Sequence, residues 1–567
     1  MFSLTGAGAA LSQEPAPTNA PAATTTTPDA ATAPKKSVSE SLAPLAPEPP
    51  PKDAVTGDWL LRNMSGEPDT LNPILATDVY SDMVFGNIYE SLTRQNPKTL
   101  KYEAGLAESW EVSEDKLTFT FHLRKDVKWS DGKPFTAADV KYTFDRIKDP
   151  KVDAPHLQVY YIDLVSWEAL DDYTVRFKAS KPYFKFFDML GGASIIPKHI
   201  FDDGTDFNKH PANRKPIGTG PYVLEKWDTG TQFVITRRDD YWGQKLYDVF
   251  PKKIVMRVVA DDNVAMQNLK SGVIDLYERI LPLQWTREFN KPEYEERFHK
   301  LVYDYPQYSY FGFNLRRPLF SDVKVRKALD LLVDRKKIID RVYMGLATAV
   351  SGPFYIKTPS YNHDVKPTQY DPEAAAKLLA EAGWKDTDGD GILDKDGKPF
   401  TFKMLTVADN VRQQRVGEIM QQDFLKAGIK MEFHKLEWAA FLKLVGERQF
   451  DAVTMAWALD TKTDPYQIWN SGEADKPNSS NNVGYKNAEV DKMMDEARLE
   501  FDDPKREAIY RKIHSIIAAD VPCIFLVAPK QLSAVAKRWQ NIVTFGPRPC
   551  FDVTTWYVPK DKQKYKD

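Results

Sequence analysis

An aromatic side chain and a carboxylate lie three residues apart at the end of an apolar stretch of this 567-residue sequence. Residues 452–457 form a short apolar run between turn-forming residues, a pattern that is typical of a buried β-strand. Trp457 closes this run, and Asp460 lies in the acidic, polar loop that follows it. Because ligands of α/β proteins bind at the carboxyl ends of strands, both side chains are candidates for a ligand site. The alternative is a core tryptophan followed by a solvated loop carboxylate.

A second candidate site is the acidic segment 386–397. It matches the first half of an EF-hand calcium loop through four aspartates, Asp386, Asp388, Asp390 and Asp394. The twelfth position, where such a loop carries a bidentate glutamate, holds Gly397. Without that ligand the segment is half of a calcium cage, so a solvated turn between a helix and a strand is the alternative to a metal site.

Residues that would identify an enzyme are missing from the sequence. It contains no HExxH, GxSxG or P-loop motif, and its eight histidines are scattered singly. His122 and His434 lie in expected strands, where a histidine is more often structural than catalytic. We therefore expect no enzymatic activity and no cofactor. A hydrolase or transferase that uses the carboxylates of a cleft is the alternative from a different class.

Length, charge and cysteine content narrow the possible partners. A chain of 567 residues is too long for one hydrophobic core and predicts two or more lobes. The net charge of -3 gives no reason to expect nucleic acid or an anionic membrane as a partner. No apolar run approaches the eighteen residues of a membrane-spanning helix. Cys523 and Cys550 could form one disulfide or remain two buried thiols.

Residues 1–56 differ in composition from the rest of the chain. They are rich in proline, alanine and threonine, and no aromatic residue follows Phe2. Such a segment cannot bury enough apolar surface to offset its ordering entropy, so we expect a disordered tether. Its first ten residues, MFSLTGAGAA, are similar to the end of a secretory signal. Our preferred interpretation is a secreted protein that this tether holds off a surface.

The elements that must position the candidate residues change in character along the chain. The first half mixes antiparallel strands with short helices: residues 117–123 and 173–177 alternate apolar and polar residues, and Thr136 caps a helix over 137–147. In the second half, helices that begin near Ser321, Asp371 and Asp503 alternate with strands at 401–405, 430–434, 452–457 and 523–527. This alternation predicts a mostly parallel sheet that is covered on both faces. Two lobes of different character in one chain predict a cleft between them.

Longer blocks of the sequence resemble one known family. The blocks are GEPDTLNP (66–73), AESWEVSEDKLTFTFHLRKDVKWSDGKPFTAADVKYTFDRI (107–147), IIPKHIF (195–201), PIGTGPYVLEKW (216–227), NLRRPLFSDVKVRKAL (314–329) and EWAAFLKLV (437–445). In their order and spacing they resemble the family 5 extracellular solute-binding proteins, the peptide- and nickel-binding components of bacterial ABC importers. The resemblance covers the chain from Gly57 to the C-terminus and leaves out the tether.

The resemblance implies an α/β fold, the two-lobed clamshell of a type II periplasmic binding protein in its large three-subdomain variant, with mixed sheets. We expect lobe I at 57–312, with an extra subdomain at about 100–215, lobe II at 313–535, and a C-terminal return to lobe I at 536–567. The expected hinge crossings lie near 310–314 and 533–539.

The resemblance also assigns roles to individual residues. In peptide-binding members, an aspartate three residues after a strand-end tryptophan anchors the α-ammonium group of the ligand, and a second tryptophan lies 22 positions before that aspartate. Asp460, Trp457 and Trp438 match both spacings. The loop after Asp460 departs from the pattern, so Asp464 could share or replace its role.

The function that the resemblance implies is the capture of short peptides for an ABC importer. The protein would be periplasmic or held in the cell envelope, would act as a monomer, and would deliver its ligand to a membrane permease without binding nucleic acid. Other solutes of the same fold stay open, namely a nickel complex, an oligosaccharide or haem. An envelope chaperone on this fold is a further alternative.

Overall fold

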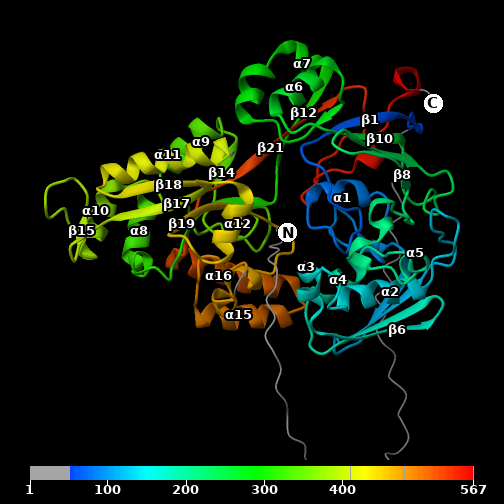
Figure 1. The fold of residues 1–567 in the computed structure, drawn as a ribbon, viewed down its shortest axis with the longest axis horizontal. Coiled ribbons are helices and arrows are strands. Elements are labelled where there is room, and N and C mark those ends of the chain that lie inside the picture. Colours follow the sequence, from blue (N-terminus) through cyan, green and yellow to red (C-terminus); the bar gives the residue numbers. More distant parts are fainter. Residues whose placement is uncertain (1–51, 409, 477–478, 566–567) are drawn as a thin grey trace, which may run out of the picture.

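The structure is a computed structural model that describes residues 52–408, 410–476 and 479–565. The expected tether at 1–56 therefore lies almost entirely outside the described residues. Three large sheets of eight, five and four strands organise the described part of the chain. In Figure 1 the five-stranded sheet and its helices form an arm on the left, and the other two sheets lie one above the other on the right.

The eight-stranded sheet joins distant parts of the chain. Its strand order is β12-β21-β11-β1-β10-β9-β8, with β14 paired to β21. The strands are β1 (Gly57–Met64), β8 (Tyr222–Asp228), β9 (Gln232–Arg237), β10 (Pro251–Val258), β11 (Leu276–Tyr277), β12 (Phe298–Asp304), β14 (Ala347–Ala349) and β21 (Val527–Ala536). Helices α6 (Asp262–Ser271) and α7 (Pro292–Arg297) are packed against it through a buried cluster that includes Leu269, Phe289 and Phe298.

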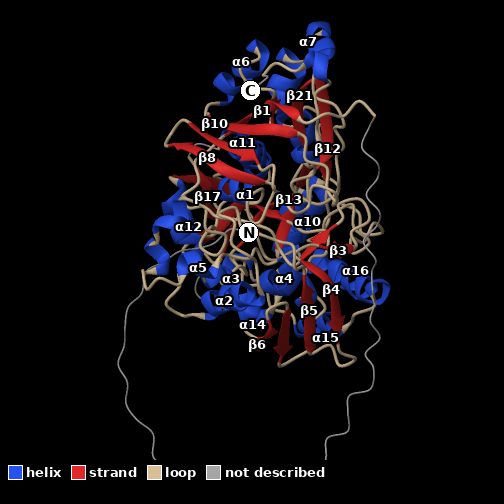
Figure 2. Cartoon of the chain, turned by 90° about the vertical axis from the view of Figure 1, so that its right-hand side faces the viewer, coloured by secondary structure: helices blue, strands red, loops and turns tan. Residues whose placement is uncertain are grey.

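The four-stranded sheet is an antiparallel layer at the lower end of the molecule (Figure 2). Its strands are β4 (Ala107–Val112), β5 (Thr118–Leu123), β6 (Leu164–Asp171) and β7 (Thr174–Ala179). Helix α2 (Ala137–Lys148) packs on it and buries Val140, Phe144 and Ile147, as their spacing predicts. Thr136 and Asp139 form a capping box, which fixes the start of this helix. The predicted strands and helix of this region are therefore confirmed.

The five-stranded sheet has the order β18-β17-β19-β13-β20. Its strands are β13 (Gln307–Phe313), β17 (Thr401–Val407), β18 (Lys430–Leu436), β19 (Ala452–Ala458) and β20 (Cys523–Phe525). Strands β17, β18 and β19 pair in parallel, whereas β13 is antiparallel to both of its neighbours. The prediction of a mostly parallel sheet is thus confirmed except at β13. That strand enters directly from the eight-stranded sheet and not through a crossover helix.

Helices cover both faces of the five-stranded sheet. Strand β13 alternates, with Phe311 and Phe313 in one buried cluster and Tyr308 and Tyr310 in another. The first cluster includes residues of α8 (Val323–Leu331), α9 (Arg335–Val342), α10 (Pro372–Glu381) and α11 (Val411–Lys426). The second includes residues of α15 (Ala488–Leu499) and α16 (Asp503–Asp520), and α12 (Trp438–Gly446) packs through a smaller cluster with β17 and β19.

The chain passes twice between the eight- and five-stranded sheets. Residues 305–306 join β12 to β13, and residue 526 joins β20 to β21. The single strand expected at 523–527 is therefore wrong, because it spans two strands of different sheets. Residues after β21 return to β1, where the rings of Trp59 and Tyr565 stack with centroids 4.7 Å apart. The exact lobe boundaries stay a prediction.

Shorter elements connect these layers. They are α1 (Val79–Phe85), α3 (Pro155–Gln158), α4 (Phe186–Gly192), α5 (Lys198–Phe201), α13 (Tyr466–Trp469), α14 (Ser471–Ala474), β2 (Thr93–Gln95), β3 (Tyr102–Ala104), β15 (Asp394–Lys395) and β16 (Lys398–Pro399). Within the described ranges, no helix has the length and apolar character needed to cross a membrane.

Candidate ligand-binding site

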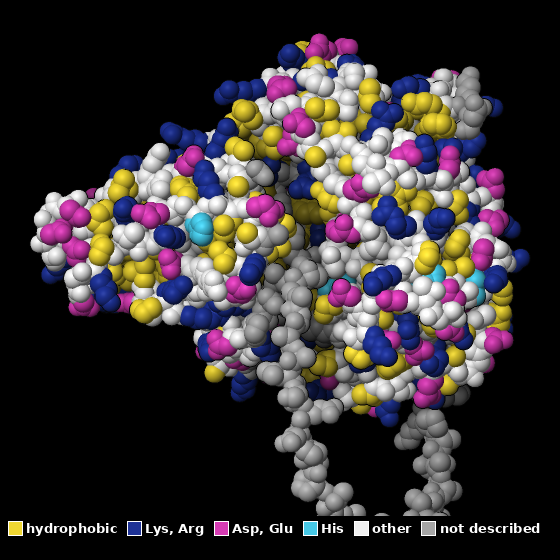
Figure 3. All heavy atoms as spheres, viewed as in Figure 1, with side chains coloured by type: hydrophobic (Ala, Val, Ile, Leu, Met, Phe, Trp, Pro, Cys, Tyr) yellow, Lys and Arg dark blue, Asp and Glu magenta, His cyan; other side chains and the backbone are white. Residues whose placement is uncertain are grey.

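Asp460 lies where three separate parts of the chain meet. It follows β19 by two residues, and the loop is fixed by a hydrogen bond of 2.8 Å from the Leu459 amide to the Pro306 carbonyl. Its side chain is 57% exposed. One carboxylate oxygen accepts a hydrogen bond of 3.2 Å from Arg548 Nη2, and the other lies 3.6 Å from Lys185 Nζ. Figure 3 shows that the surface is hollowed between the arm and the stacked sheets.

The two cations control the charge of Asp460. The partial removal of water around its carboxylate raises the pKa of Asp460, but the combined attraction of Lys185 and Arg548 outweighs this, so that the pKa lies below the ordinary value. At neutral pH Asp460 is therefore an anion with an exposed edge. An anion in that state can pair with a cationic ligand group.

The two predicted tryptophans lie in different surroundings. Trp457, near the end of β19, is half-buried against the cluster that contains Tyr308 and Tyr310. Trp438 is the first residue of α12 and is 41% exposed. Its ring stacks on Phe441, with centroids 5.6 Å apart. Their role as the walls of a side-chain pocket stays a prediction.

Asp464 is engaged by neighbouring side chains. One of its oxygens accepts hydrogen bonds of 2.9 Å from Arg498 Nε and 2.9 Å from the Tyr183 hydroxyl. The other oxygen accepts a hydrogen bond of 3.1 Å from the Tyr466 amide, and the side chain is only 11% exposed. A ligand ammonium group would have to displace Arg498 to reach this carboxylate.

Strand β19 has an open edge beside Asp460. It pairs with β13 along its whole length, but with β17 only at Ala452 and Val453. The carbonyl of Ser309 in β13 accepts from Leu526, so its backbone faces away from β19. In an antiparallel pair, the backbone groups of two opposite residues either bond to each other or both face away from each other. Ala456 pairs with Ser309, so its amide and carbonyl also face away from the partner strand, toward the open edge.

A pocket with a cavity volume of about 160 Å³ lies over β13 and β19 and extends to this edge. Thr454 and Ala456 of β19 line it together with Arg412 and Gln413 near the start of α11. Gln413 Nε2 donates a hydrogen bond to the Thr454 carbonyl, which ties α11 to the strand. Arg412 is the one charged side chain among the residues that line the pocket, and it makes no ion pair within the described ranges. The pocket is therefore suited to an anionic group.

Comparison with known proteins now assigns this arrangement to a family. Residues 101–479 match the family model of the bacterial extracellular solute-binding proteins, family 5. The chain belongs to this solute-binding family. The oligopeptide-binding protein AppA of Bacillus subtilis is 32% identical over 521 residues, which cover 89% of this chain and 92% of AppA. The dipeptide-binding protein of Escherichia coli is 27% identical and covers 86% of this chain and 93% of its own.

Solved structures of this solute-binding family share the fold. The structure of Bacillus subtilis AppA in complex with a nonapeptide matches with a TM-score of 0.77 and 30% identity, over 89% of this chain and 100% of that chain. DppA of Helicobacter pylori in complex with the peptide STSA gives a TM-score of 0.77 and 26% identity, over 90% and 99% of the two chains. The predicted type II binding-protein clamshell with mixed sheets is confirmed.

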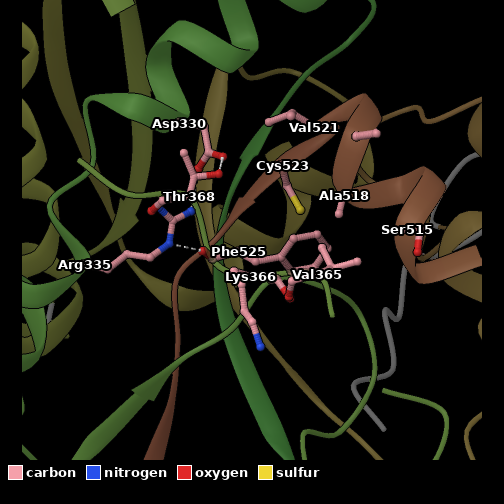
Figure 4. Close-up of a pocket in the computed structure, with 12 residues that line it drawn as sticks. Asp330, Arg335, Val365, Lys366, Thr368, Ser515, Ala518, Val521, Cys523 and Phe525 are labelled. Atoms are coloured by element: carbon pink, nitrogen blue, oxygen red, sulfur yellow. Dashed lines mark hydrogen bonds and ion pairs between the residues drawn. The ribbon is translucent and has the colours of Figure 1, made fainter. Parts of the chain in front are cut away.

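A second cavity of about 230 Å³, drawn in Figure 4, holds charges that are already satisfied. Arg335 donates to Asp330, to the Phe525 carbonyl at 2.8 Å and to the Thr368 carbonyl at 3.0 Å. The other oxygen of Asp330 accepts from the Thr368 hydroxyl. Burial raises the pKa of the Cys523 thiol well above its ordinary value, which keeps this thiol protonated and unreactive. We interpret this cavity as structural.

A serine and a histidine contact each other beside this cavity, but their geometry does not support a hydrolase. His514 Nε2 lies 3.1 Å from Ser351 Oγ, while Nδ1 accepts a hydrogen bond of 3.2 Å from the Asn362 amide. Because Nδ1 is the acceptor, the proton of the neutral imidazole is on Nε2, which donates to Ser351 and cannot take its proton. Ser351 in turn lies 2.7 Å from the Val365 carbonyl, to which it donates. This pair is a satisfied internal network.

The remaining sequence candidates have clear surroundings. Oxygens of Asp386, Asp388 and Asp394 come within 4.8 Å of one another, but Asp386 accepts hydrogen bonds from the amides of Gly389 and Gly391. Those bonds are typical of a tight acidic turn, and calcium at Asp386, Asp388, Asp390 and Asp394 stays a prediction.

Cys523 and Cys550 are both free and buried. Of the two alternatives for these cysteines, the structure shows two buried thiols.

Sequence reasoning missed three residues of this site. Arg412 follows the end of a parallel strand at the start of a helix, a position where α/β proteins bind ligands, so the pattern of 401–412 could have indicated it. Lys185 and Arg548 lie 275 and 88 residues away from Asp460 in the sequence. No local pattern marks them, because only the tertiary fold brings them to the end of β19.

Proposed function

We propose that this protein captures short peptides between its two lobes and delivers them to the membrane permease of an ABC importer. Membership of the extracellular solute-binding family supports this proposal, as does the similarity to AppA, an oligopeptide-binding protein, and to the dipeptide-binding protein of Escherichia coli. A periplasmic or cell-envelope location and a monomeric state belong to the same proposal. The observation that carries it is the open edge of β19, which has an anion at one end and a cation at the other.

The strand edge suits the main chain of a peptide. Backbone groups of Ala456 point to the open edge, so an extended peptide can add to β19 as a further strand. Main-chain hydrogen bonds are independent of side chains, which allows binding of many sequences. From Thr454 to Ala458 the strand rises by about 13 Å at about 3.3 Å per residue, which matches four or five residues of an extended peptide.

The two ends of the edge suit the two ends of a peptide. Asp460 presents a half-exposed carboxylate to the ligand's α-ammonium group. Arg412 presents a guanidinium group that forms no ion pair with any residue the structure describes, and the residues that line its pocket include no acidic side chain. A peptide that lies along β19 with its N-terminus at Asp460 brings its C-terminal carboxylate toward Arg412. Opposite charges at both ends fix the direction of the peptide as well as its register.

The two chain crossings suit a hinge, and they lie a few residues before the crossings expected near 310–314 and 533–539, which fall in and directly after β13 and β21. Residues 305–306 and residue 526 are short links between two separately packed sheets, and links of this kind can absorb the rotation of one lobe against the other. Contacts between the lobes also exist far from these links, as the hydrogen bond between Tyr183 and Asp464 shows. A bound peptide would stabilise the closed state by touching both lobes.

The test of this proposal is peptide binding to wild-type protein and to Asp460→Asn. Native mass spectrometry of the purified protein identifies co-purified peptides, and calorimetry then measures their affinity. Loss of the carboxylate leaves an ammonium group unpaired in the closed cleft and is expected to cost about 3 kcal/mol or more, a loss of over a hundredfold.

The matched control is Asp239→Asn, because Asp239 is 94% exposed and pairs with Arg237 away from the cleft. Its affinity for peptides should equal that of the wild type. A single non-peptide mass in the native spectrum would overturn the peptide assignment. Undiminished peptide affinity in Asp460→Asn would remove the ammonium anchor.

A further inference from the structure

Two cationic side chains that have no role in the proposed capture of peptides contact Asp460. Lys185 precedes α4, in the part of the molecule that contains the four-stranded sheet, and Arg548 belongs to the C-terminal segment after β21. Both reach across to a loop of the five-stranded sheet. Their side chains are 19% and 32% exposed, so both have left much of their water.

Asp460 is the one acid that forms an ion pair with either cation among the described residues. Asp188, the nearest acid along the chain from Lys185, forms its ion pair with Lys462 at 3.9 Å. Burial raises the pKa of Asp188, and the charges of Lys462 and Lys185 offset part of this rise. Burial raises the pKa of Asp82 of α1, and the charge of Arg548 offsets part of this rise, but no ion pair joins the two in the described part of the chain. In the described part of the chain, Asp460 is therefore the one carboxylate in direct contact with these two partly desolvated cations.

A ligand ammonium group at Asp460 upsets this balance. It would be the third cation around one carboxylate, in a cleft from which closure removes water. Like charges brought together without water oppose binding, and a partly buried cation that loses its ion-pair partner is destabilised. An anionic group of the ligand, placed next to its ammonium group, would restore the balance by taking over Lys185 and Arg548.

We propose that Lys185 and Arg548 make the cleft selective for peptides that carry an acidic side chain at the first residue. This inference rests on the proposed function and names a substrate class for the same site. The side chain of the first residue is the one nearest the ammonium group in an extended peptide, so Asp or Glu there reaches the two cations while the ammonium group pairs with Asp460. A neutral side chain supplies no anion to the two cations, and a basic side chain adds a fourth positive charge.

The experiment compares three tetrapeptides that differ only in their first residue, Glu, Gln or Lys, each followed by Ala-Phe-Ala. Calorimetry measures their dissociation constants for the wild type, Lys185→Met and the double variant Lys185→Met/Arg548→Gln. For the wild type we expect the Glu peptide to bind about tenfold more tightly than the Gln peptide, and the Lys peptide to bind most weakly. In Lys185→Met the preference should shrink to about threefold, and in the double variant it should vanish.

Two further variants secure the interpretation. Lys181→Met removes an exposed lysine four residues from Lys185 and should keep the wild-type preference. Lys185→Arg retains the charge and should also keep it, which separates a charge effect from a folding defect.

Equal affinities of the wild type for the Glu and Gln peptides would overturn this inference and leave peptide binding intact. So would a preference that persists in the double variant. Failure of all three peptides to bind the wild type would overturn the proposed function and this inference with it.

Discussion

Asp460 and Asp464 lie four residues apart in one loop, and their partners give them different tasks. Asp460 is 57% exposed and paired only with side chains from the other side of the cleft. Asp464 is 11% exposed and is held by Arg498, which comes from the same lobe, and by the Tyr466 amide. A buried acid whose two oxygens both accept hydrogen bonds is a poor anchor for a ligand, because an ammonium group must displace a donor to reach it. Asp464 is therefore expected to shape the loop that presents Asp460.

The variant Asp464→Asn should lower stability and leave peptide binding almost unchanged. The single amide oxygen can accept from the Tyr183 hydroxyl or from the Tyr466 amide but not from both, because these donors bond to different oxygens of Asp464. The charge that compensates Arg498 is also lost. We expect the free energy of unfolding to fall by about 1–3 kcal/mol, measured by urea denaturation. Peptide affinity should change less than threefold. A hundredfold loss of affinity at unchanged stability would instead assign the ammonium group to Asp464.

Sequence reasoning found Asp460 but could not find its partners. Asp460 stands directly after an apolar strand, and the tryptophan three residues before it fits a longer pattern, so local spacing carries the information. Lys185 precedes a helix that is expected from no strong pattern, and Arg548 lies between prolines in an irregular segment. Such residues meet Asp460 through the packing of whole sheets. Their meeting is a property of the tertiary structure alone.

His514 should make the stability of the protein depend on pH. Its imidazole is fully buried, and burial lowers its pKa from 6.5 to about 4. The unfolded chain binds a proton at this residue below about pH 6.5, whereas the folded chain does so only near pH 4. The stabilisation is thus present above pH 6.5 and is lost as the pH falls toward 4, by about 3 kcal/mol in all.

The measurement is urea denaturation at several pH values between 7 and 4. Other groups also titrate there, so the wild type is compared with His514→Gln, which keeps a polar group beside Ser351 but has no charge to gain. The variant should be less stable than the wild type at pH 7, and the difference should narrow as the pH falls. A difference that stays constant with pH would show that protonation of His514 does not oppose folding.

At the scale of elements, strongly periodic segments were predictable and sheet membership was not. The helix at 137–147 and the strand at 452–457 appear within a few residues of their predicted bounds, because capping and apolar spacing are local signals. The apolar run at 523–527 gives no sign that it is divided between two sheets. Both halves are buried, and burial on both faces produces the same sequence in either sheet.

The open edge of β19 leads to a prediction about the backbone of the ligand. Ala456 turns its amide and carbonyl toward the peptide, and its neighbours in the strand turn theirs toward β13. Peptide residues on the added strand should therefore alternate between those that bond to β19 and those that do not. N-methylation of single amides along a bound pentapeptide should weaken binding about tenfold at alternate positions and little at the others. Calorimetry measures this series, and uniform losses would argue against strand addition.

At the scale of the whole molecule, the two lobes are held together at a contact far from the hinge. Phe184 lies between α15 and α16 of the five-stranded lobe, and its amide donates a hydrogen bond of 3.0 Å to the Arg498 carbonyl. The guanidinium group of Arg506 lies 4.1 Å from the centre of the Phe184 ring, and Phe184 is only 4% exposed. Arg498 itself lies over the rings of Tyr183 and Tyr466, at 4.6 and 4.2 Å. Because these contacts join different lobes, a motion that separates the lobes would break them.

The variant Phe184→Ala should therefore weaken closure more than it weakens folding. Phe184 joins neither lobe's buried apolar clusters, so its loss should shift the balance between open and closed states by about 1–3 kcal/mol. We expect the dissociation rate of a bound peptide to rise about tenfold to a hundredfold in stopped-flow displacement, and the radius of gyration of the peptide-free protein to increase in X-ray scattering. Leu170→Ala, at an exposed position of β6 in the four-stranded sheet, should change neither quantity. A dissociation rate that stays at the wild-type value would mean that the hinge and the ligand alone determine closure. In that case the contact at Phe184 would only accompany the closed state and would not stabilise it.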